Sequence, residues 1–234
     1  MAVKVGLEEA YYSKMTKDEK GSALYDVPVR LPTVQKVGVN PKVNKTPVPG
    51  DNIIADELTQ CLGADITVQR KEFTLEEEAI LLGRLKDADG GVYGGTKDNA
   101  PYVAFGYKRT FSDNSGLYVW LLKTKFAPSN SDAETKPADG ITPQYDTLTA
   151  SSLTREADGQ WIYSRYSTDP NFGATFFSKA TLEKLANVVS QTYGQPATVS
   201  SVASLPANGT PGVIYHLQGD DSFHYWNGSA FVEI

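Results

Sequence analysis

The residues best suited to chemistry in this chain are a glycine-rich run and the acidic side chains before it. Residues 90–97 (Gly-Gly-Val-Tyr-Gly-Gly-Thr-Lys) have the glycine content of a phosphate-binding loop, but such a loop needs Gly-Lys-Ser/Thr at the start of a helix. Here the order is Gly-Thr-Lys, and Asp-Asn-Ala-Pro follows. Asp87 and Asp89 fit the start of a calcium loop, but the third acid and the distal glutamate are missing. The run is therefore predicted to be a hairpin tip, and the two acids a solvated turn.

The other candidate catalytic or metal-binding residues are isolated. His216 and His224 fall on predicted neighbouring strands and could face each other, but no third ligand or nucleophile motif accompanies them. The single cysteine, Cys61, excludes a disulfide within the chain and a cysteine-based zinc cluster, and we expect it to be a buried apolar residue. The three acids at residues 76–78 are interpreted as partners of a helix dipole. We therefore expect no enzyme activity, no cofactor and no bound metal.

Length and composition indicate a globular protein with one sizeable domain and a small appendage. The chain has 234 residues, of which 40% are apolar. With 22 basic and 28 acidic side chains, its net charge of −6 argues against a protein that binds duplex DNA. No segment approaches the roughly 20 apolar residues that span a bilayer, and the polar start lacks a signal sequence. We expect no membrane partner and synthesis in a reducing cytosol.

Charge is distributed unevenly along the chain. Residues 1–50 carry eight basic and five acidic side chains, a net +3, and residues 51–100 carry five and eleven, a net −6. Residues 196–234 have three acids and neither lysine nor arginine, a net −3. The adjacent blocks of opposite sign are either ordinary surface variation or complementary faces that meet between copies of this chain.

Two short helices are predicted. Thr74-Leu75-Glu76-Glu77 is a capping box, and Gly83 is a typical stop signal. Between them, apolar residues recur at helical spacing at Leu75, Ala79 and Leu82. A second helix is expected to start near Ser178 or Thr181 and to end at Gly194 and Pro196. Its apolar face would hold Leu182, Leu185 and Val189.

Most of the remaining pattern predicts β-strands. Apolar alternation or runs occur at residues 3–7, in two short pieces of 25–39, and at 66–71, 102–107, 117–126, 147–154 and 161–166. Residues 156–159 (Glu-Ala-Asp-Gly) predict a hairpin turn between the last two strands. Residues 117–122 are apolar on both faces, so a second sheet, a helix or a neighbouring subunit must cover both.

A proline-containing segment, residues 40–57, is predicted to be a long loop. Prolines 41, 47 and 49 prevent it from forming a central strand, since proline lacks the donor that a ladder needs. At eighteen residues it is long for a simple connection, and such loops usually bind something. We expect an extended arm that contacts a neighbouring copy. Its candidate interface residues are Pro41, Val43, Pro47, Val48, Pro49, Ile53 and Ile54.

The last part of the chain, from Pro196, has a different character. Four short strands are predicted at residues 202–205, 212–217, 222–226 and 230–234, with Asn-Gly turns at 208–209 and 227–228. Another long polar loop is expected at 127–145. The expected domains are therefore residues 1–195 and a small β-hairpin module, 196–234.

The order of several motifs resembles a known family. These motifs are AVKVGL at residues 2–7, AYYSKMTK at 10–17, LEEEAILLG at 75–83, DNAPYVAFGY at 98–107 and YVWLLKTKF at 118–126. Together they resemble the major tail proteins of long-tailed phages of Gram-positive bacteria, the phi13-type family, over roughly residues 1–190. Residues 205–231 are similar to small hairpin modules that are appended to phage virion proteins.

The resemblance implies a mainly β fold, a sandwich or barrel-like core with flanking short helices, in a structural protein of the virion tail. It implies hexameric rings that stack into a tail tube through which DNA leaves, a tape-measure protein inside, tail-end proteins as partners, and synthesis in the cytoplasm of the bacterial host. Ring assembly would then cover the doubly apolar strand. Two alternatives stay open. One is the tube of a phage-derived bacteriocin. The other is a carbohydrate-binding surface β-protein with exposed aromatics, although Tyr11, Tyr12, Trp120, Trp161 and Trp226 are predicted to pack in a core or interface.

Overall fold

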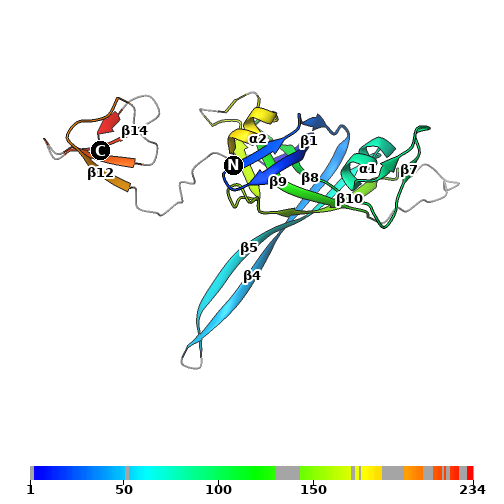
Figure 1. Cartoon of the computed structure of the whole chain (residues 1–234), viewed down its shortest axis with the longest axis horizontal. Helices are drawn as coiled ribbons and strands as arrows, with labels where there is room; N and C mark the ends of the chain where they lie inside the picture. Colours follow the sequence, from blue (N-terminus) through cyan, green and yellow to red (C-terminus); the bar gives the residue numbers. More distant parts are fainter. Residues whose placement is uncertain are drawn as a thin grey trace. The chain divides into compact units, whose positions relative to one another are not determined.

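The computed structural model describes residues 3–50, 53–129, 143–169, 172–173, 175–185, 198–207, 213–217, 219, 222–226 and 231–233. The chain divides into two compact units, Met1–Val188 and Val189–Ile234 (Figure 1), which are described separately here. The mainly β fold predicted from the sequence is confirmed. Neither described helix has the length or the apolar character needed to cross a membrane.

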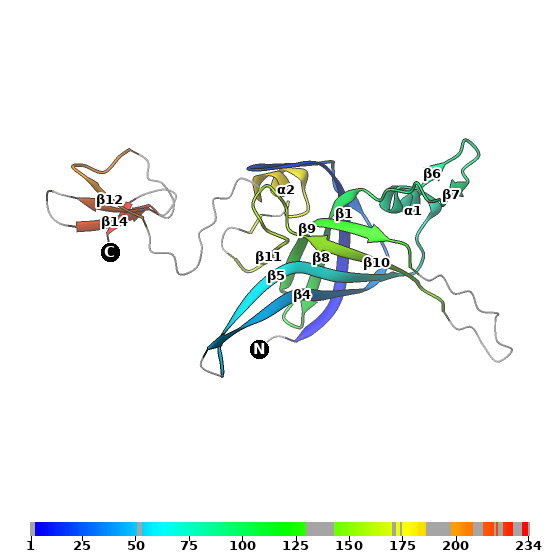
Figure 2. The same cartoon turned by 60° about the horizontal axis from the view of Figure 1, so that its bottom comes forward.

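The larger unit is built on one antiparallel sheet. Its strands are β1 (Lys4–Glu19), β2 (Ser22–Tyr25), β3 (Val29–Arg30), β4 (Val34–Gly50), β5 (Ile53–Arg70), β8 (Tyr102–Phe111), β9 (Gly116–Ala127), β10 (Asp146–Leu153) and β11 (Ile162–Tyr166). In the described residues they are ordered β2-β1-β8-β9-β10-β5-β4, with β3 paired to β1 and β11 paired to β9. Figure 2 shows that this sheet is strongly curved, so the core is enclosed by one sheet and not by two stacked ones.

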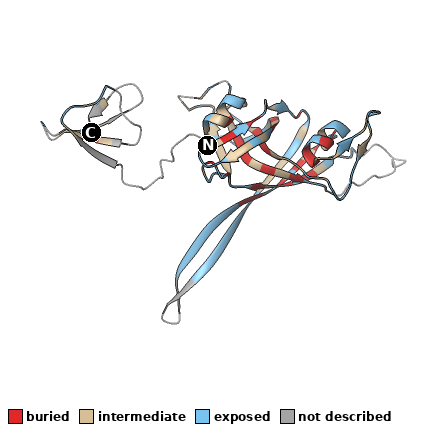
Figure 3. Ribbon diagram, viewed as in Figure 1, coloured by how far each residue is buried: buried red, intermediate tan, exposed pale blue. Residues whose placement is uncertain are grey.

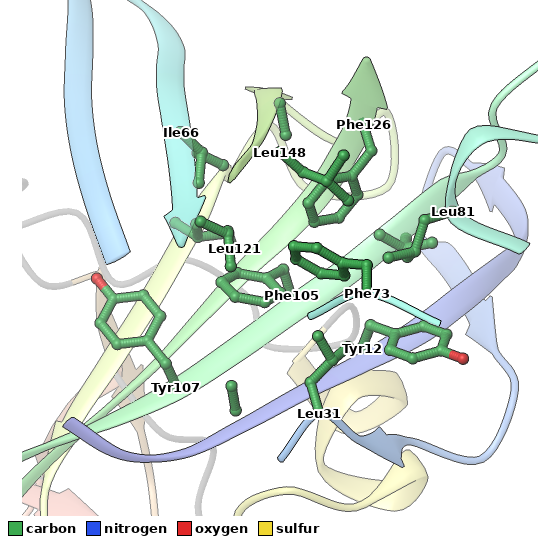
Figure 4. Close-up of a cluster of buried hydrophobic side chains, with 14 of the residues drawn as sticks. Tyr12, Leu31, Ile66, Phe73, Leu81, Phe105, Tyr107, Leu121, Phe126 and Leu148 are labelled. Carbon is green, nitrogen blue, oxygen red and sulfur yellow. The ribbon is translucent and has the colours of Figure 1, made fainter. Parts of the chain in front are cut away.

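The inner face of the curved sheet holds the main core. Tyr12 of β1 and Ile66 of β5 belong to the same buried cluster, although three strands separate β1 from β5 in the sheet order. Phe105 of β8 lies edge-on to Phe126 of β9, with ring centroids 5.9 Å apart. Figure 4 shows these side chains converging with Leu81 of the first helix. Ile66 and Val68 are buried, which confirms the predicted half-buried strand.

Helix α1 (Leu75–Leu82) has the predicted ends. The Thr74 hydroxyl accepts the Glu77 N–H, the Glu77 carboxylate accepts the Thr74 N–H, and Gly83 ends the helix at a φ of 65°. One part of the prediction is wrong, because Leu75 is 58% exposed. The helix packs through its C-terminal turn, where Ala79, Leu81 and Leu82 are buried.

The outer face of β9 has its own core. Trp120 and Leu122 are buried there with Tyr25, Phe176 and Leu182 of helix α2 (Lys179–Leu185). The Trp120 indole N–H donates to the Phe176 carbonyl oxygen at 3.1 Å. Both faces of the doubly apolar strand are therefore covered, as predicted. The covering elements belong to this chain, so the expectation that ring assembly covers the strand is wrong.

Helix α2 begins where the sequence predicts, since the Ser178 hydroxyl accepts the Thr181 N–H at 3.2 Å. Leu182 is buried in the outer core, and Leu185 packs against it. Val189, Gly194 and Pro196, the predicted end of this helix, lie outside the described residues, as do residues 130–142 of the predicted polar loop.

The predicted hairpin across residues 156–159 does not form. Strands β10 and β11 both pair with β9, β10 beside Lys123–Ala127 and β11 beside Leu117–Leu121. The turn is still present, with Gly159 at a φ of 69°. Next to this turn, Arg155 is buried, pairs with Asp158 and donates to the Tyr25 hydroxyl at 3.1 Å. These contacts hold the turn against the outer core, and burial raises the pKa of Tyr25 to about 12.

A small hairpin, formed by β6 (Leu85–Lys86) and β7 (Val92–Tyr93), includes the start of the glycine-rich run at residues 90–97. The two strands pair across a turn in which the Asp87 carboxylate accepts the backbone N–H groups of Asp89 and Gly91. This turn confirms the structural role predicted for Asp87. No cluster of three or more His, Cys, Asp or Glu side chains in the described residues is arranged to hold a metal.

The smaller unit is a four-stranded sheet. Its strands are β12 (Thr198–Val202), β13 (Val213–Leu217), β14 (Ser222–Trp226) and β15 (Phe231–Glu233), with β12 parallel to β13 and the other pairs antiparallel. The first strand, β12, ends at Val202, the residue at which the predicted first strand was expected to begin. His216 lies opposite Phe223 and His224 opposite Tyr215, so the two imidazoles are on opposite faces and do not face each other. Both predicted Asn-Gly turns lie outside the described residues.

Candidate assembly interface

The predicted loop at residues 40–57 is part of a long antiparallel hairpin formed by β4 and β5. Their register runs from Val34 opposite Arg70 to Gly50 opposite Ile53. The loop assignment is therefore wrong, but the argument against a central strand holds, because β4 is the last strand in the sheet order. An edge strand needs a partner on one side only, so it accommodates prolines that a central strand would exclude.

The far end of this hairpin leaves the sheet. Pairing between β5 and β10 ends at Ala64 opposite Ser152, and beyond this point β5 pairs with β4 alone. We call residues 42–62 the arm; positions 51 and 52, within it, lie outside the described residues. Figure 1 shows the arm projecting from the curved sheet, and Figure 3 shows that its described surface is exposed, whereas the buried residues lie in the body.

Large apolar side chains on the arm are open to solvent. Val43 is 47% exposed, Leu58 61% and Leu62 48%. Cys61 is also exposed, which corrects its prediction as a buried residue. A two-stranded ribbon has no second layer, so neither of its faces can bury a side chain as the body of the sheet does.

The structure places all seven sequence-predicted interface residues on this hairpin. Pro41, Val43 and Pro47 are exposed on β4. Val48, Pro49, Ile53 and Ile54 lie in the ladder near the tip, but their side chains are outside the described set. Sequence reasoning missed Leu58 and Leu62, which are on the returning strand. No local signal pointed to them, because only the pairing of β5 with β4 places them on the arm.

The prolines affect how the arm can contact another molecule. A proline fits a two-stranded ladder only where its nitrogen faces away from the partner strand. Pro41, Pro47 and Pro49 therefore remove N–H donors from the free edge of β4. An edge without these donors is a poor template for adding another strand. Contacts made by the β4 edge of the arm should therefore use side chains and not strand addition.

Charged side chains along the hairpin are paired within it. Lys45 Nζ lies 2.7 Å from Glu57 Oε1, and Lys42 Nζ lies 2.6 Å from Asp65 Oδ1. The hydrogen bond from Lys42 is the main reason that the pKa of Asp65 is below its ordinary value. Exposed pairs of this kind contribute little to stability. Their main effect here is to neutralise part of the arm's surface, so that apolar contacts there are less opposed by charge.

The body end of the hairpin is fixed to α1. Arg70, at the end of β5, is buried; its Nη1 donates to Glu77 Oε2 and its Nε to the Pro32 carbonyl oxygen, both at 2.6 Å. Burial alone would raise the pKa of Glu77, but hydrogen bonds from Thr74 and Arg70 outweigh it and lower the pKa. The arm therefore projects from an anchored base.

A cavity of about 770 Å³ lies beside α1 and β10. Its lining includes Phe73, Glu78, Leu82, Arg84, Tyr145, Asp146 and Leu148. Glu78 and Arg84 form an ion pair at 3.0 Å, and Asp146 accepts the Phe73 N–H at 2.8 Å. These charged groups serve the fold, so the cavity is a weaker candidate site than the arm.

Four of the five aromatic residues that the sequence analysis considered for sugar binding are packed. Tyr12 and Trp120 are buried, and Trp161 packs against the main core. Tyr11 stacks on Phe177, with ring centroids 4.6 Å apart. The side chain of Trp226 is outside the described set.

Comparisons with known proteins add no assignment. No protein-family model matches the chain, and no curated protein matches it.

Proposed function

We propose that this chain is a self-assembling structural protein whose copies form stacked rings, the tail tube of a phage or of a phage-derived bacteriocin. The observation that carries the proposal is the arm. It is a long hairpin that is exposed in the described chain, and it bears Val43, Leu58 and Leu62 on its surface.

A protruding ribbon of this kind favours a partner. An isolated two-stranded hairpin is marginally stable in water, and exposed apolar groups on a projection mark interaction sites. The partner we propose is another copy of this chain. If the arm contacts a different surface on the next copy, the interface is heterologous, and such contacts build rings when the rotation closes.

The remaining details of the proposal rest on the family resemblance. These are the six-fold ring, the tape-measure protein inside the tube, the tail-end proteins, the passage of DNA and the location in the virion tail. The acidic composition supports a DNA conduit, because a basic channel would hold the phosphates and slow their release.

The test is to remove the arm and observe assembly. Residues 43–62 are replaced by a short Gly-Ser linker that joins Lys42 to its ladder partner Gly63, and the purified variant and wild-type chain are compared by negative-stain microscopy and light scattering. We expect rings or tubes from the wild type and a folded monomer from the variant, since the remaining sheet keeps its cores. Circular dichroism checks that the variant is folded.

Two outcomes would contradict the proposal. Tubes of normal length from the arm variant would show that the arm is not an assembly element. A wild-type chain that stays a 25.4 kDa monomer and binds glycans would favour the carbohydrate-binding alternative.

A further inference from the structure

Gly63, at the base of the arm, has a backbone conformation that other residues rarely adopt. Its φ is +122°, and it is buried. A Cβ atom built on it would overlap the Ser152 carbonyl oxygen and would lie 3.0 Å from the Ser152 carbonyl carbon. The position therefore requires glycine for two reasons, the positive φ and the close approach of β10.

A β-bulge lies at the same point. Lys42 is opposite Gly63, but the next residue, Val43, is opposite Cys61, so Leu62 is an extra residue on β5. Bulges bend the strand that contains them and increase its local twist. The bulge falls two residues beyond Ala64, where the pairing of β5 with β10 ends.

Polar contacts fix the body side of this bend. Asp65 accepts hydrogen bonds from Lys42 of β4 at 2.6 Å and from the Ser151 hydroxyl of β10 at 3.2 Å. One carboxylate thus connects three neighbouring strands next to the bulge. These contacts join the three strands beside Gly63, and the close approach of Gly63 to Ser152 of β10 limits how far the chain can rotate there.

We infer that Gly63 and the Leu62 bulge form an elbow that sets the direction in which the arm leaves the body. Gly63 is a positioning residue, because it acts through the arm that it orients. The consequence for assembly rests on the proposed function. An arm that leaves at another angle would miss its contact surface on the next copy, although its own side chains are unchanged.

The test measures arm direction without reference to assembly. In a Cys61→Ser background, spin labels are attached at Thr46→Cys on the arm and Glu72→Cys on the body, both at exposed positions. The label-to-label distance distribution is compared before and after Gly63→Ala. Gly38→Ala is the matched control, since Gly38 is also in β4–β5 and its added Cβ would meet nothing closer than the Thr67 Cβ at 3.8 Å.

We expect Gly63→Ala to shift the most frequent distance by more than the width of the Gly38→Ala distribution, and rings to be lost in Gly63→Ala alone. An unshifted distribution would overturn the elbow, whatever the assembly state. A shifted distribution with normal rings would leave the elbow but refute its role in assembly. If Gly63→Ala does not fold, deletion of Leu62 makes the same test by removing the bulge without adding a side chain, and an unshifted distribution there would again overturn the inference.

Discussion

Trp120 illustrates how one residue in this protein supports both a core and a loop. Its ring is fully buried on the outer face of β9, and its indole N–H satisfies the Phe176 carbonyl of the segment that leads into α2. The ring also lies edge-on to Phe177 at 5.3 Å. Removing this side chain would therefore leave a cavity and an unpaired carbonyl together.

We predict that Trp120→Ala lowers the free energy of unfolding by about 3–5 kcal/mol, as large aromatic truncations in cores do. The measurement is urea unfolding followed by circular dichroism, and much of the variant should be insoluble. Tyr166→Ala is the control, because Tyr166 is an aromatic on neighbouring β11 that is 50% exposed. A Trp120→Ala chain as stable as the wild type would contradict the placement of this residue in the core.

A second residue-scale prediction concerns acid stability. Burial alone would raise the pKa of Asp18, but hydrogen bonds from Lys123 and from the backbone N–H groups of Glu156 and Ala157 lower it below 3.8. The folded state therefore binds this proton less readily than the unfolded state. The stabilisation is present above about pH 4 and is lost as the pH falls through the folded-state pKa.

The measurement is urea unfolding between pH 7 and pH 3. We expect the free energy of unfolding to fall below about pH 4, and the fall to be shallower in Asp18→Asn, which has no carboxylate to protonate. Asp18→Asn should also be less stable at pH 7, because Lys123 Nζ loses its partner at 2.6 Å. Asp26→Asn, at an exposed carboxylate, is the control for the removal of one negative charge. An unchanged profile in Asp18→Asn would assign the acid sensitivity to other groups.

At the scale of the element, α1 depends on its capping box. The Thr74 hydroxyl accepts the Glu77 N–H at 3.3 Å, and Glu77 is also the partner of buried Arg70. We predict that Thr74→Ala costs about 1 kcal/mol of stability, as the loss of an N-cap does. Thr74→Ser keeps the hydroxyl and should cost less than half as much in the same urea titration. Equal losses of stability in the two variants would show that the Thr74 hydroxyl does not stabilise the helix.

The elements differ in how much of their structure was visible in the sequence. Helix α1 was predictable because its signals, Thr74 and Gly83, act within one turn of the residues they cap. The arm was predicted as an extended, binding segment but not as a strand. Proline spacing indicates only that the segment avoids the sheet interior, whereas its pairing with β5 depends on residues that come after the tip. The exposure of Cys61 was missed for the same reason, because it depends on the pairing of β5 with β4 in the arm.

Tertiary contacts explain the other errors. The turn at residues 156–159 has a local hairpin signal, yet β11 pairs with β9, and Ala157 of the turn belongs to the same buried cluster as Trp120. Likewise, the covering of both faces of β9 was predictable from its composition, but the identity of the covering element was not. On the outer face the covering residues include α2, which lies more than fifty residues further along the chain.

At the scale of the whole molecule, the chain separates into a large unit with two cores and a small four-stranded unit. The small unit has its own aromatic packing, with Tyr215 edge-on to Phe231 at 5.2 Å. Residues 196–234 contain neither lysine nor arginine. They therefore have no lysine or arginine side chain that could pair with an acidic surface. This composition suits a solvated, separable module.

We predict that this module decorates the outside of the assembled tube. Six copies of a 39-residue module would crowd a central channel, and the acidic Asp220-Asp221 pair favours solvent. Truncation after Gly194 should therefore leave tubes that still form and are thinner in negative-stain images. The large unit should stay folded, because all the residues described in its two cores lie before Val189. Loss of tubes from a truncated chain that is folded by circular dichroism would instead make the module a clamp that holds successive rings together.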